Sequence, residues 1–264
     1  DYYVYSVDDH ALQPAAKGAR TAELSPNGAL LGLERDGDLY SFDMASKRET
    51  RLTRDARDLV FNGHFDWVYE EEFGMAQAWN WSPDSRHLAY WQVDESAEPI
   101  IQLSDYSGAH PEWDKLRIPQ PGDSNPTVRI GVVNVTTGKQ VWLDTKATGD
   151  FYIPRIYWTS AADTLAVLEL NRKQNTLRLF FFNVNDAGSR LVRTWTSPTW
   201  LDVYDFYAGI QDMMTFPAGS REFFWISDQD GWQHIYRYDY SGRLVNQVTR
   251  GRWTATKITG IDAR

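Results

Sequence analysis

The sequence predicts an all-β fold, a partial β-propeller made of roughly four to five four-stranded blades. Three features predict it: short runs that alternate apolar and polar residues, turn signals that separate them, and strand endings that recur along the chain. Alternation is typical of strands that bury one face. Recurrence of the same unit indicates a repeat architecture.

The alternating runs are spread along the whole chain. They are residues 3–7, 39–43, 129–135 and 233–238. Turn signals rich in Pro, Gly, Asn, Asp and Ser stand between such runs and precede apolar strands. These signals begin at Ser25, Ser82 and Phe216, with a degenerate copy at Trp158. We expect each of them to be a tight turn that enters an inner strand of a blade.

The repeat units also end in a similar way: a strand is followed by a turn that contains Gly or Lys, and a further strand comes after this turn. Residues 51–54 read Arg-Leu-Thr-Arg, and residues 247–250 read Gln-Val-Thr-Arg. The turn signals recur at roughly 55 to 75 residues, whereas a minimal blade needs about 40 to 45, so some loops are long. The longest, residues 95–125, is expected to leave its blade. Residues 254–262 are expected to form an inner strand of a further blade.

Three consecutive glutamates form the most distinctive motif. The segment reads Asp66-Trp67-Val68-Tyr69-Glu70-Glu71-Glu72-Phe73-Gly74. Its apolar neighbours favour an interior or a cleft, where the negative charge needs a cation. Asp66 is placed to cap a short helix. The motif breaks the strand pattern, so it is assigned to an insertion at about residues 62–78. The alternative is a solvated acidic face with only a structural role.

Composition narrows the classes of partner. The chain has 27 Lys and Arg against 36 Asp and Glu, a formal charge of −9, which disfavours nucleic acid as a partner. The chain contains no run of 18 apolar residues, which a membrane span would require. It also does not open with a basic segment followed by an apolar one, as a leader sequence would. The chain has no Cys, and its five His form no zinc-binding pair. We therefore expect neither a metal nor another cofactor.

The acidic motif resembles the double-Glu motif of the dipeptidyl peptidase IV group in the prolyl oligopeptidase superfamily. Further matches follow in the same order along the chain. They are Trp81-Ser82-Pro83-Asp84, Asp94-Glu95-Ser96 with Pro99, Asp105-Tyr106, Asn125-Pro126-Thr127-Val128, and the segment from Ser227 to Tyr236. The resemblance covers most of the 264 residues. It implies that residues 1–264 are part of an N-terminal, eight-bladed propeller domain.

The resemblance also implies an activity. The family releases dipeptides from peptide N-termini, with preference for Pro or Ala at the second position, and two glutamates bind the substrate ammonium. By position these are Glu71 and Glu72, and Glu70 is a flanking acid. The family's aromatic loop near the substrate corresponds most closely to residues 200–207, which makes Tyr204 and Phe206 further candidates.

Other functional parts are expected outside the chain. No Gly-x-Ser-x-Gly sequence occurs in it. The resemblance implies that the serine triad lies in an α/β-hydrolase domain beyond residue 264. The family's carbonyl-binding Arg falls before Asp1. The chain alone is therefore expected to be inactive. Family habit further implies a homodimer and a periplasmic or extracellular location in a bacterium.

Two other classes of function remain open at this point. The 12 Trp and 14 Tyr also suit a carbohydrate-binding or carbohydrate-active propeller, because sugar rings stack on aromatic side chains. Against this, the acids are contiguous and do not face each other across a bond. The third class is a stand-alone scaffold that presents its loops to a protein partner.

Overall fold

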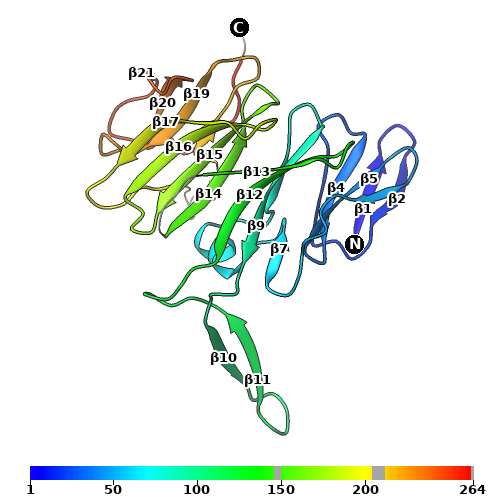
Figure 1. Ribbon diagram of the computed structural model, residues 1–264. Coiled ribbons are helices and arrows are strands. Elements are labelled where there is room, and N and C mark those ends of the chain that lie inside the picture. The colour runs from blue at the N-terminus through cyan, green and yellow to red at the C-terminus, as the bar shows by residue number, and fades with distance from the viewer. Residues whose placement is uncertain (146–149, 204–211, 263–264) are drawn as a thin grey trace. The chain divides into compact units, whose positions relative to one another are not determined.

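The computed structural model describes residues 1–145, 150–203 and 212–262 (Figure 1). Two compact units divide the chain, Asp1–Trp142 and Leu143–Arg264, and each is described by itself. Within the described residues nearly all regular structure is β-strand, and the strand pairs of known register are antiparallel.

The first unit opens with a two-stranded pair and a four-stranded sheet. The pair is β1 (Tyr2–Ser6) with β2 (Ala11–Ala16), and the sheet consists of β3 (Thr21–Leu24), β4 (Leu30–Arg35), β5 (Asp38–Asp43) and β6 (Glu49–Arg51). The sheet order β3-β4-β5-β6 follows the chain, as in a meander. The turn from Ser25 leads from β3 into β4.

The second sheet of this unit carries the acidic insertion. Its strands are β7 (Val60–Asn62), β8 (Trp79–Trp81), β9 (His87–Asp94), β12 (Thr127–Asn134) and β13 (Gln140–Leu143). Both β7 and β8 pair with β9, at its two ends. The chain thus leaves the edge of β9 after Asn62 and returns to the same edge at Trp79. A separate hairpin, β10 (Ile100–Asp105) with β11 (Glu112–Arg117), extends from the sheet (Figure 1).

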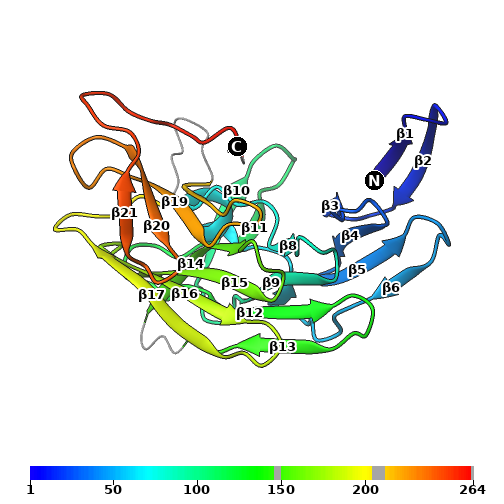
Figure 2. The same ribbon diagram turned by 90° about the horizontal axis from the view of Figure 1, so that it is seen from above.

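The second unit contains two four-stranded meanders. The first is β14 (Phe151–Trp158), β15 (Thr164–Asn171), β16 (Thr176–Asn183) and β17 (Ser189–Thr196). The second is β18 (Met214–Thr215), β19 (Glu222–Ser227), β20 (His234–Asp239) and β21 (Leu244–Gln247). Figure 2 shows β14 to β17 side by side in chain order.

These sheets are the blades of a partial β-propeller, which confirms the predicted fold class. The described residues form four sheets of four or five strands, in agreement with the predicted number of blades, and two separate strand pairs, β1–β2 and β10–β11. One expected strand is wrong: residues 254–262 form no strand. Ala255 makes a single backbone bond, donated to Gln233 O at 2.8 Å. A strand needs a ladder of such bonds with a neighbour, and this segment has none.

The recurrent strand endings have a shared physical role that differs slightly from the expected one. β6 ends at Arg51 and β21 at Gln247, so the threonines of the two endings lie just beyond the strands. Thr53 Oγ1 accepts the N–H of Leu39 at 2.9 Å, and Thr249 Oγ1 accepts the N–H of Ile235 at 3.0 Å. Each threonine therefore connects the end of its blade's last strand to the start of the blade's third strand through a hydrogen bond.

Large side chains fill the core between the two sheets of the first unit. Trp79, Leu39, Leu88, Tyr90 and Val133 are fully buried and pack in one cluster. Trp79 lies at the point where the acidic insertion rejoins the sheet. The end of the insertion is therefore anchored in the best-packed part of the unit.

Candidate functional site

The acidic motif lies on a single helical turn, η1 (Val68–Glu72), between β7 and β8. Val68, Tyr69 and Phe73 are buried, whereas Glu71 and Glu72 are exposed. The apolar side chains pack on the sheet, and the turn therefore directs the acids outward. The glutamates are held on a fixed support without being buried themselves.

Asp66 caps this turn, as predicted. Its carboxylate accepts the backbone N–H of Val68 at 2.9 Å and of Tyr69 at 3.3 Å. Its carbonyl oxygen accepts the N–H of Glu70 at 3.1 Å. The first N–H groups of a helical turn lack partners within the turn, so these bonds fix its start.

A row of aromatic rings supports the turn from below. Phe65 and Tyr69 stack with ring centroids 5.2 Å apart, Tyr69 and Phe73 lie 5.3 Å apart, and Phe65 meets Trp91 of β9 edge-on at 5.1 Å. All four rings are almost completely buried. Aromatic contacts of this kind add to the stabilisation from burial alone. The backbone of η1 is therefore tied to the centre of its sheet.

Gly63 sets the direction in which the insertion leaves the sheet. Its φ is +78°, and a Cβ atom there would lie 2.5 Å from Leu39 Cδ2. Its N–H donates to Trp91 O at 2.9 Å. Both the backbone conformation and the lack of space require glycine at this position.

Arg20 neutralises one of the three glutamates. It forms an ion pair with Glu70, and both side chains are partly exposed. The two residues line a hollow of about 440 Å³ together with Thr21, Met75 and neighbouring backbone. Arg20 lies 50 residues before Glu70 in the sequence, and no sequence pattern links the two. Sequence analysis therefore missed this cation.

The site differs from the sequence-based expectation in one respect. The motif was expected in an interior or a cleft, but Glu71 and Glu72 are exposed, and neither of them lines the hollow beside Glu70. The apolar residues of the motif are the ones that became buried. The two remaining candidates, Tyr204 and Phe206, lie outside the described residues.

A pair of buried carboxyl groups lies behind the turn. Asp66 and Glu98 are both nearly inaccessible, and the charge of Asp66 acts on the carboxyl group of Glu98. Burial, with the Asp66 charge next in importance, raises the pKa of Glu98 to about 9. Burial also raises the pKa of Asp66. Two buried carboxyl groups that act on each other favour binding a proton, and the raised pKa of Glu98 keeps that proton on Glu98 at neutral pH.

This pair connects the turn to the base of the β10–β11 hairpin. Glu98 lies just before β10, and Arg117 at the end of β11 donates to the carbonyl oxygen of Glu98 at 2.6 Å. Burial, together with the nearby Asp66 charge, raises the pKa of Glu95 to about 7. The site therefore contains a second acidic layer, which the sequence motif did not reveal.

His64, close to the motif in sequence, is not a proton carrier near neutral pH. Burial and the neighbouring Arg20 charge lower its pKa to about 4. Its ring lies 4.9 Å from that of Phe61. His64 is therefore a neutral packing residue under ordinary conditions.

Two other kinds of site are absent from the described residues. No group of three or more metal-ligating side chains occurs among them. None of their helices is long and apolar enough to cross a membrane.

Comparisons with known proteins agree with the fold and with the family resemblance. The sequence model of the dipeptidyl peptidase IV (DPP IV) N-terminal region matches residues 1–264. Dipeptidyl peptidase 4 of Trichophyton tonsurans is 28% identical over 279 residues, and a probable dipeptidyl peptidase 4 of Aspergillus fumigatus is 30% identical over 281 residues. These alignments cover 100% and 99% of this chain but only 35% and 36% of the relatives.

Solved structures give the same result. The crystal structure of Porphyromonas gingivalis dipeptidyl peptidase 4 superposes with a TM-score of 0.88 at 32% identity, over 99% of this chain and 37% of that one. A putative dipeptidyl aminopeptidase IV from Bacteroides ovatus superposes with a TM-score of 0.81 at 22% identity, over 98% and 38% of the two chains, and supports the fold alone. The chain belongs to the family of dipeptidyl peptidase IV N-terminal regions.

Proposed function

We propose that this chain is the substrate-recognition propeller of a serine exopeptidase that releases X-Pro or X-Ala dipeptides from peptide N-termini. Family membership and the names of the relatives support a peptidase. The observation that carries the proposal is the capped, ring-supported turn that presents Glu71 and Glu72 together. The adjacent Glu70 is engaged with Arg20, and the family motif assigns Glu71 and Glu72 to the substrate.

Charge explains why a free N-terminus is selected. A carboxylate about 4 Å from an ammonium gains on the order of 4 kcal/mol at an effective dielectric of 20. Two carboxylates that share one cation also relieve their mutual repulsion. A peptide with a blocked amine offers no such compensation. Fixing the ammonium at Glu71 and Glu72 sets a distance of two residues to the bond that is cleaved.

The rest of the machinery is assigned to sequence outside this chain, which spans about 35% of its curated relatives. A hydrolase domain would supply the nucleophile, the base and the oxyanion hole. It would also cover the exposed side of η1, and so exclude water and strengthen the electrostatic contact with the ammonium. The chain by itself is proposed to be inactive.

The test uses the full-length protein and an Ala-Pro anilide substrate. Glu71→Gln and Glu72→Gln are each expected to lower kcat/KM roughly a hundredfold or more, a loss of about 3 kcal/mol. Glu70→Gln is the matched control, because it removes an equal charge from the same turn. It is expected to change kcat/KM by less than about fivefold, since Glu70 is paired with Arg20. Unchanged kinetics in both of the first variants would contradict the proposal.

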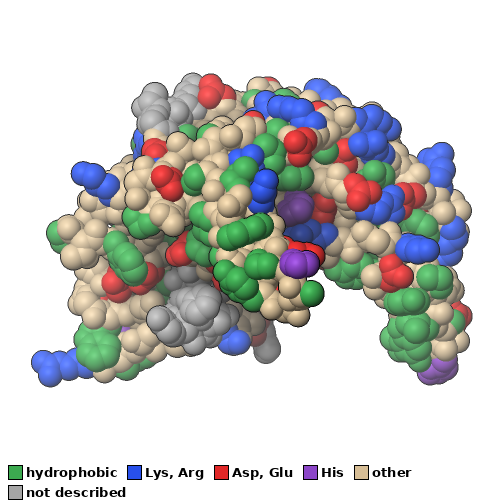
Figure 3. Space-filling view, turned by 90° about the horizontal axis from the view of Figure 1, so that it is seen from below, with side chains coloured by type: hydrophobic (Ala, Val, Ile, Leu, Met, Phe, Trp, Pro, Cys, Tyr) green, Lys and Arg blue, Asp and Glu red, His purple; other side chains and the backbone are tan. Residues whose placement is uncertain are grey.

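The β10–β11 hairpin is proposed to contribute to a homodimer. Its large exposed apolar side chains are Ile100, Leu103, Tyr106, Trp113 and Leu116. Figure 3 shows apolar side chains gathered over the hairpin, which faces the viewer. An exposed cluster of this kind is typical of an interface, and the family habit makes a second copy the proposed partner. Trp113→Ser with Leu103→Ser is expected to lower the dimer fraction in sedimentation velocity runs; an unchanged fraction would argue against this role.

We also propose, from the usual location of bacterial family members, that the protein is periplasmic or extracellular in a bacterium. Fractionation of the source cells, with activity measured in each fraction, tests it. Activity confined to the cytoplasmic fraction would contradict the proposal.

A further inference from the structure

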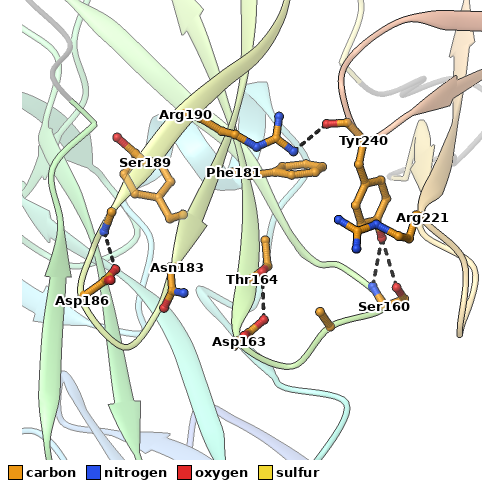
Figure 4. A pocket seen from close by; sticks show the side chains of 13 residues that line it. Ser160, Asp163, Thr164, Phe181, Asn183, Asp186, Ser189, Arg190, Arg221 and Tyr240 are labelled. Carbon is orange, nitrogen blue, oxygen red and sulfur yellow. Dashed lines mark hydrogen bonds between the residues drawn. The ribbon is translucent and has the colours of Figure 1, made fainter.

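A cavity of about 660 Å³ opens within the second unit, at the turns of its two blades (Figure 4). We call it the arginine pocket and define it by Arg190, Arg221, Asp163, Asp186, Phe181 and Tyr240. Its walls come from the β14–β15 and β16–β17 turns and from residues that flank β19 and β20. Its volume lies in the range of sites that hold small molecules.

Two arginines on one side of the pocket have no carboxylate partner among the described residues. Arg190 donates to Tyr240 O at 2.6 Å and lies 5.0 Å from the centroid of the Phe181 ring. The backbone carbonyl of Arg221 accepts the N–H of Tyr240 at 3.0 Å, which places both arginines beside the same residue. No described carboxylate forms an ion pair with either guanidinium.

Other arginines of the unit show that such pairing is common there. Those with a carboxylate partner are Arg172 with Asp150, Arg178 with Glu169, Arg237 with Glu222, and Arg243 with Asp239. The last pair leaves Asp239, the carboxylate closest to Tyr240 in the sequence, engaged elsewhere. Two cations on one side of a cavity repel each other when no carboxylate is paired with either, and a bound oxyanion would relieve this repulsion.

The opposite side of the pocket is acidic. Asp163 accepts the hydroxyl of Thr164 at 2.9 Å, and Asp186 accepts the N–H of Gly188 at 2.8 Å. Both aspartates lie on turns, across the cavity from Arg221 in Figure 4. Their charge disfavours nucleic acids and other polyanions, and it offers a place for a ligand ammonium.

Aromatic rings form the surface between the two charged sides. Phe181 is buried and meets Tyr240 edge-on, with ring centroids 5.1 Å apart. The hydroxyl of Tyr240 accepts the N–H of Ser160 at 3.2 Å, which fixes the ring in place. The pocket therefore presents a cationic side, an apolar strip and an acidic side in sequence.

We propose that the arginine pocket binds a short zwitterionic peptide. Its carboxylate would contact Arg190 and Arg221, its ammonium would face Asp163 and Asp186, and its body would lie on Phe181 and Tyr240. Arginine suits this role because its planar group binds a carboxylate through two parallel hydrogen bonds. The inference does not rest on the proposed function, although dipeptides released by a dipeptidyl peptidase belong to this class of ligand.

Calorimetric titration of the full-length protein with the dipeptide Ala-Pro tests the proposal. The protein carries Glu71→Gln and Glu72→Gln, so that the proposed ammonium site on η1 does not contribute heat. The groups are partly exposed, and a Kd of roughly 0.1 to 1 mM is expected. Arg190→Gln and Arg221→Gln are each expected to weaken binding about tenfold. Arg252→Gln, which removes an exposed arginine of the same unit outside the pocket, is the matched control and is expected to leave Kd unchanged.

Blocked ligands test the two ends of the peptide separately. Ala-Pro amide, which lacks the carboxylate, and N-acetyl-Ala-Pro, which lacks the ammonium, are each expected to bind at least about fivefold more weakly. Equal binding of the amide would overturn the proposal, as would the absence of heat with Ala-Pro at 10 mM, on the order of ten times the weakest expected Kd. Tighter binding of inorganic phosphate that displaces Ala-Pro would overturn it too, because the pocket would then be a simple oxyanion site. Thermal melts of each variant show whether a loss of binding reflects unfolding.

Discussion

Charged side chains lie next to buried aromatic rings in two regions of the molecule, the acidic turn of the first unit and the arginine pocket of the second. The two regions obtain these charges in different ways. On the turn, contiguous residues supply the charges, and Asp66 and Gly63 fix the backbone from nearby positions in the sequence. In the pocket, the charges come from three turns and from the start of β17, spread between Asp163 and Arg221. A contiguous site is visible as a motif, whereas a dispersed site becomes visible only when the strands are paired.

The largest expected effect is the loss of a supporting ring. Phe65→Ala removes the ring between Tyr69 and Trp91 and is expected to lower the free energy of unfolding by about 4 kcal/mol. Phe181→Ala in the pocket is expected to have a similar effect on stability. Only Phe65→Ala is expected to raise KM for peptide anilides, because only it releases η1. Urea denaturation measures the first quantity and steady-state kinetics the second.

Leucine at each position is the control for this comparison. Phe65→Leu and Phe181→Leu keep most of the apolar volume and are expected to cost about 1.5 kcal/mol or less. An equal rise in KM for the two alanine variants would contradict the proposed difference between the regions. It would mean that a general loss of stability, and not release of η1, raises KM.

The second effect concerns pH and is expected only at the acidic turn. The folded-state pKa of Glu98, about 9, lies above its ordinary value of 4.5. A raised pKa in an acid means that the folded state binds the proton more tightly. The contribution of this group to stability is therefore fully present below about pH 4.5 and is lost as pH rises toward 9, with a slope of at most about 1.4 kcal/mol per pH unit.

Glu98→Gln tests this pH effect, because an amide imitates the uncharged, protonated acid. The variant is expected to flatten the decline in stability between pH 5 and 9, measured by urea denaturation at several pH values. Glu112→Gln, an exposed acid on the hairpin, is the matched control. Identical profiles for Glu98→Gln and the unaltered protein would rule out the raised pKa of Glu98.

Loss of the threonine hydroxyl that connects two strands of a blade is expected to have a smaller effect on stability, in both units. Thr53 is buried, and its hydroxyl donates to the buried carboxylate of Asp38 at 2.5 Å. Thr53→Val leaves that carboxylate with one donor fewer and is expected to cost about 2 kcal/mol. Thr249 is more exposed and contacts His234 instead, so Thr249→Val is expected to cost about 1 kcal/mol. Thr53→Ser and Thr249→Ser keep the hydroxyl and serve as controls in the same denaturation experiment.

The smallest effect compares the arginines of the two regions. Arg20→Gln breaks an ion pair between partly exposed side chains and is expected to lower the free energy of unfolding by about 0.5 kcal/mol. Arg221→Gln removes a cation without a described carboxylate partner, and its expected effect on stability is close to zero. Both shifts are best measured at low salt, where exposed charges are least screened. A larger loss for Arg221→Gln than for Arg20→Gln would show that Arg221 has a structural partner.

Local patterns in the sequence were sufficient for much of the fold. Alternation located the strands that became β1, β5, β12 and β20, and the turn signal at Ser82 marked the start of β9. Asp66 was identified as a cap because capping depends on residues within one turn. Residues 254–262 were wrongly assigned to a strand. A strand also needs a neighbouring strand to pair with, and the sequence of this segment does not indicate whether one is present.

Long-range contacts explain what the sequence could not predict at the site. Arg20 reaches Glu70 from 50 residues away, and Glu98 reaches Asp66 through the start of the hairpin. Nothing in the local sequence of either residue indicates its partner. The outward direction of Glu71 and Glu72 likewise depends on which side chains the sheet can bury, and this is decided by the rings of Phe65 and Trp91.

Gly63 gives the acidic turn a particular evolutionary constraint. The residue has no ligand to recognise and no charge, but its backbone conformation and the nearby Leu39 side chain leave no room for a larger residue. In a saturation library that is selected for turnover, codon 63 should therefore tolerate fewer replacements than the codon of Glu70. The residue that permits least variation near the motif is thus one that never meets a peptide.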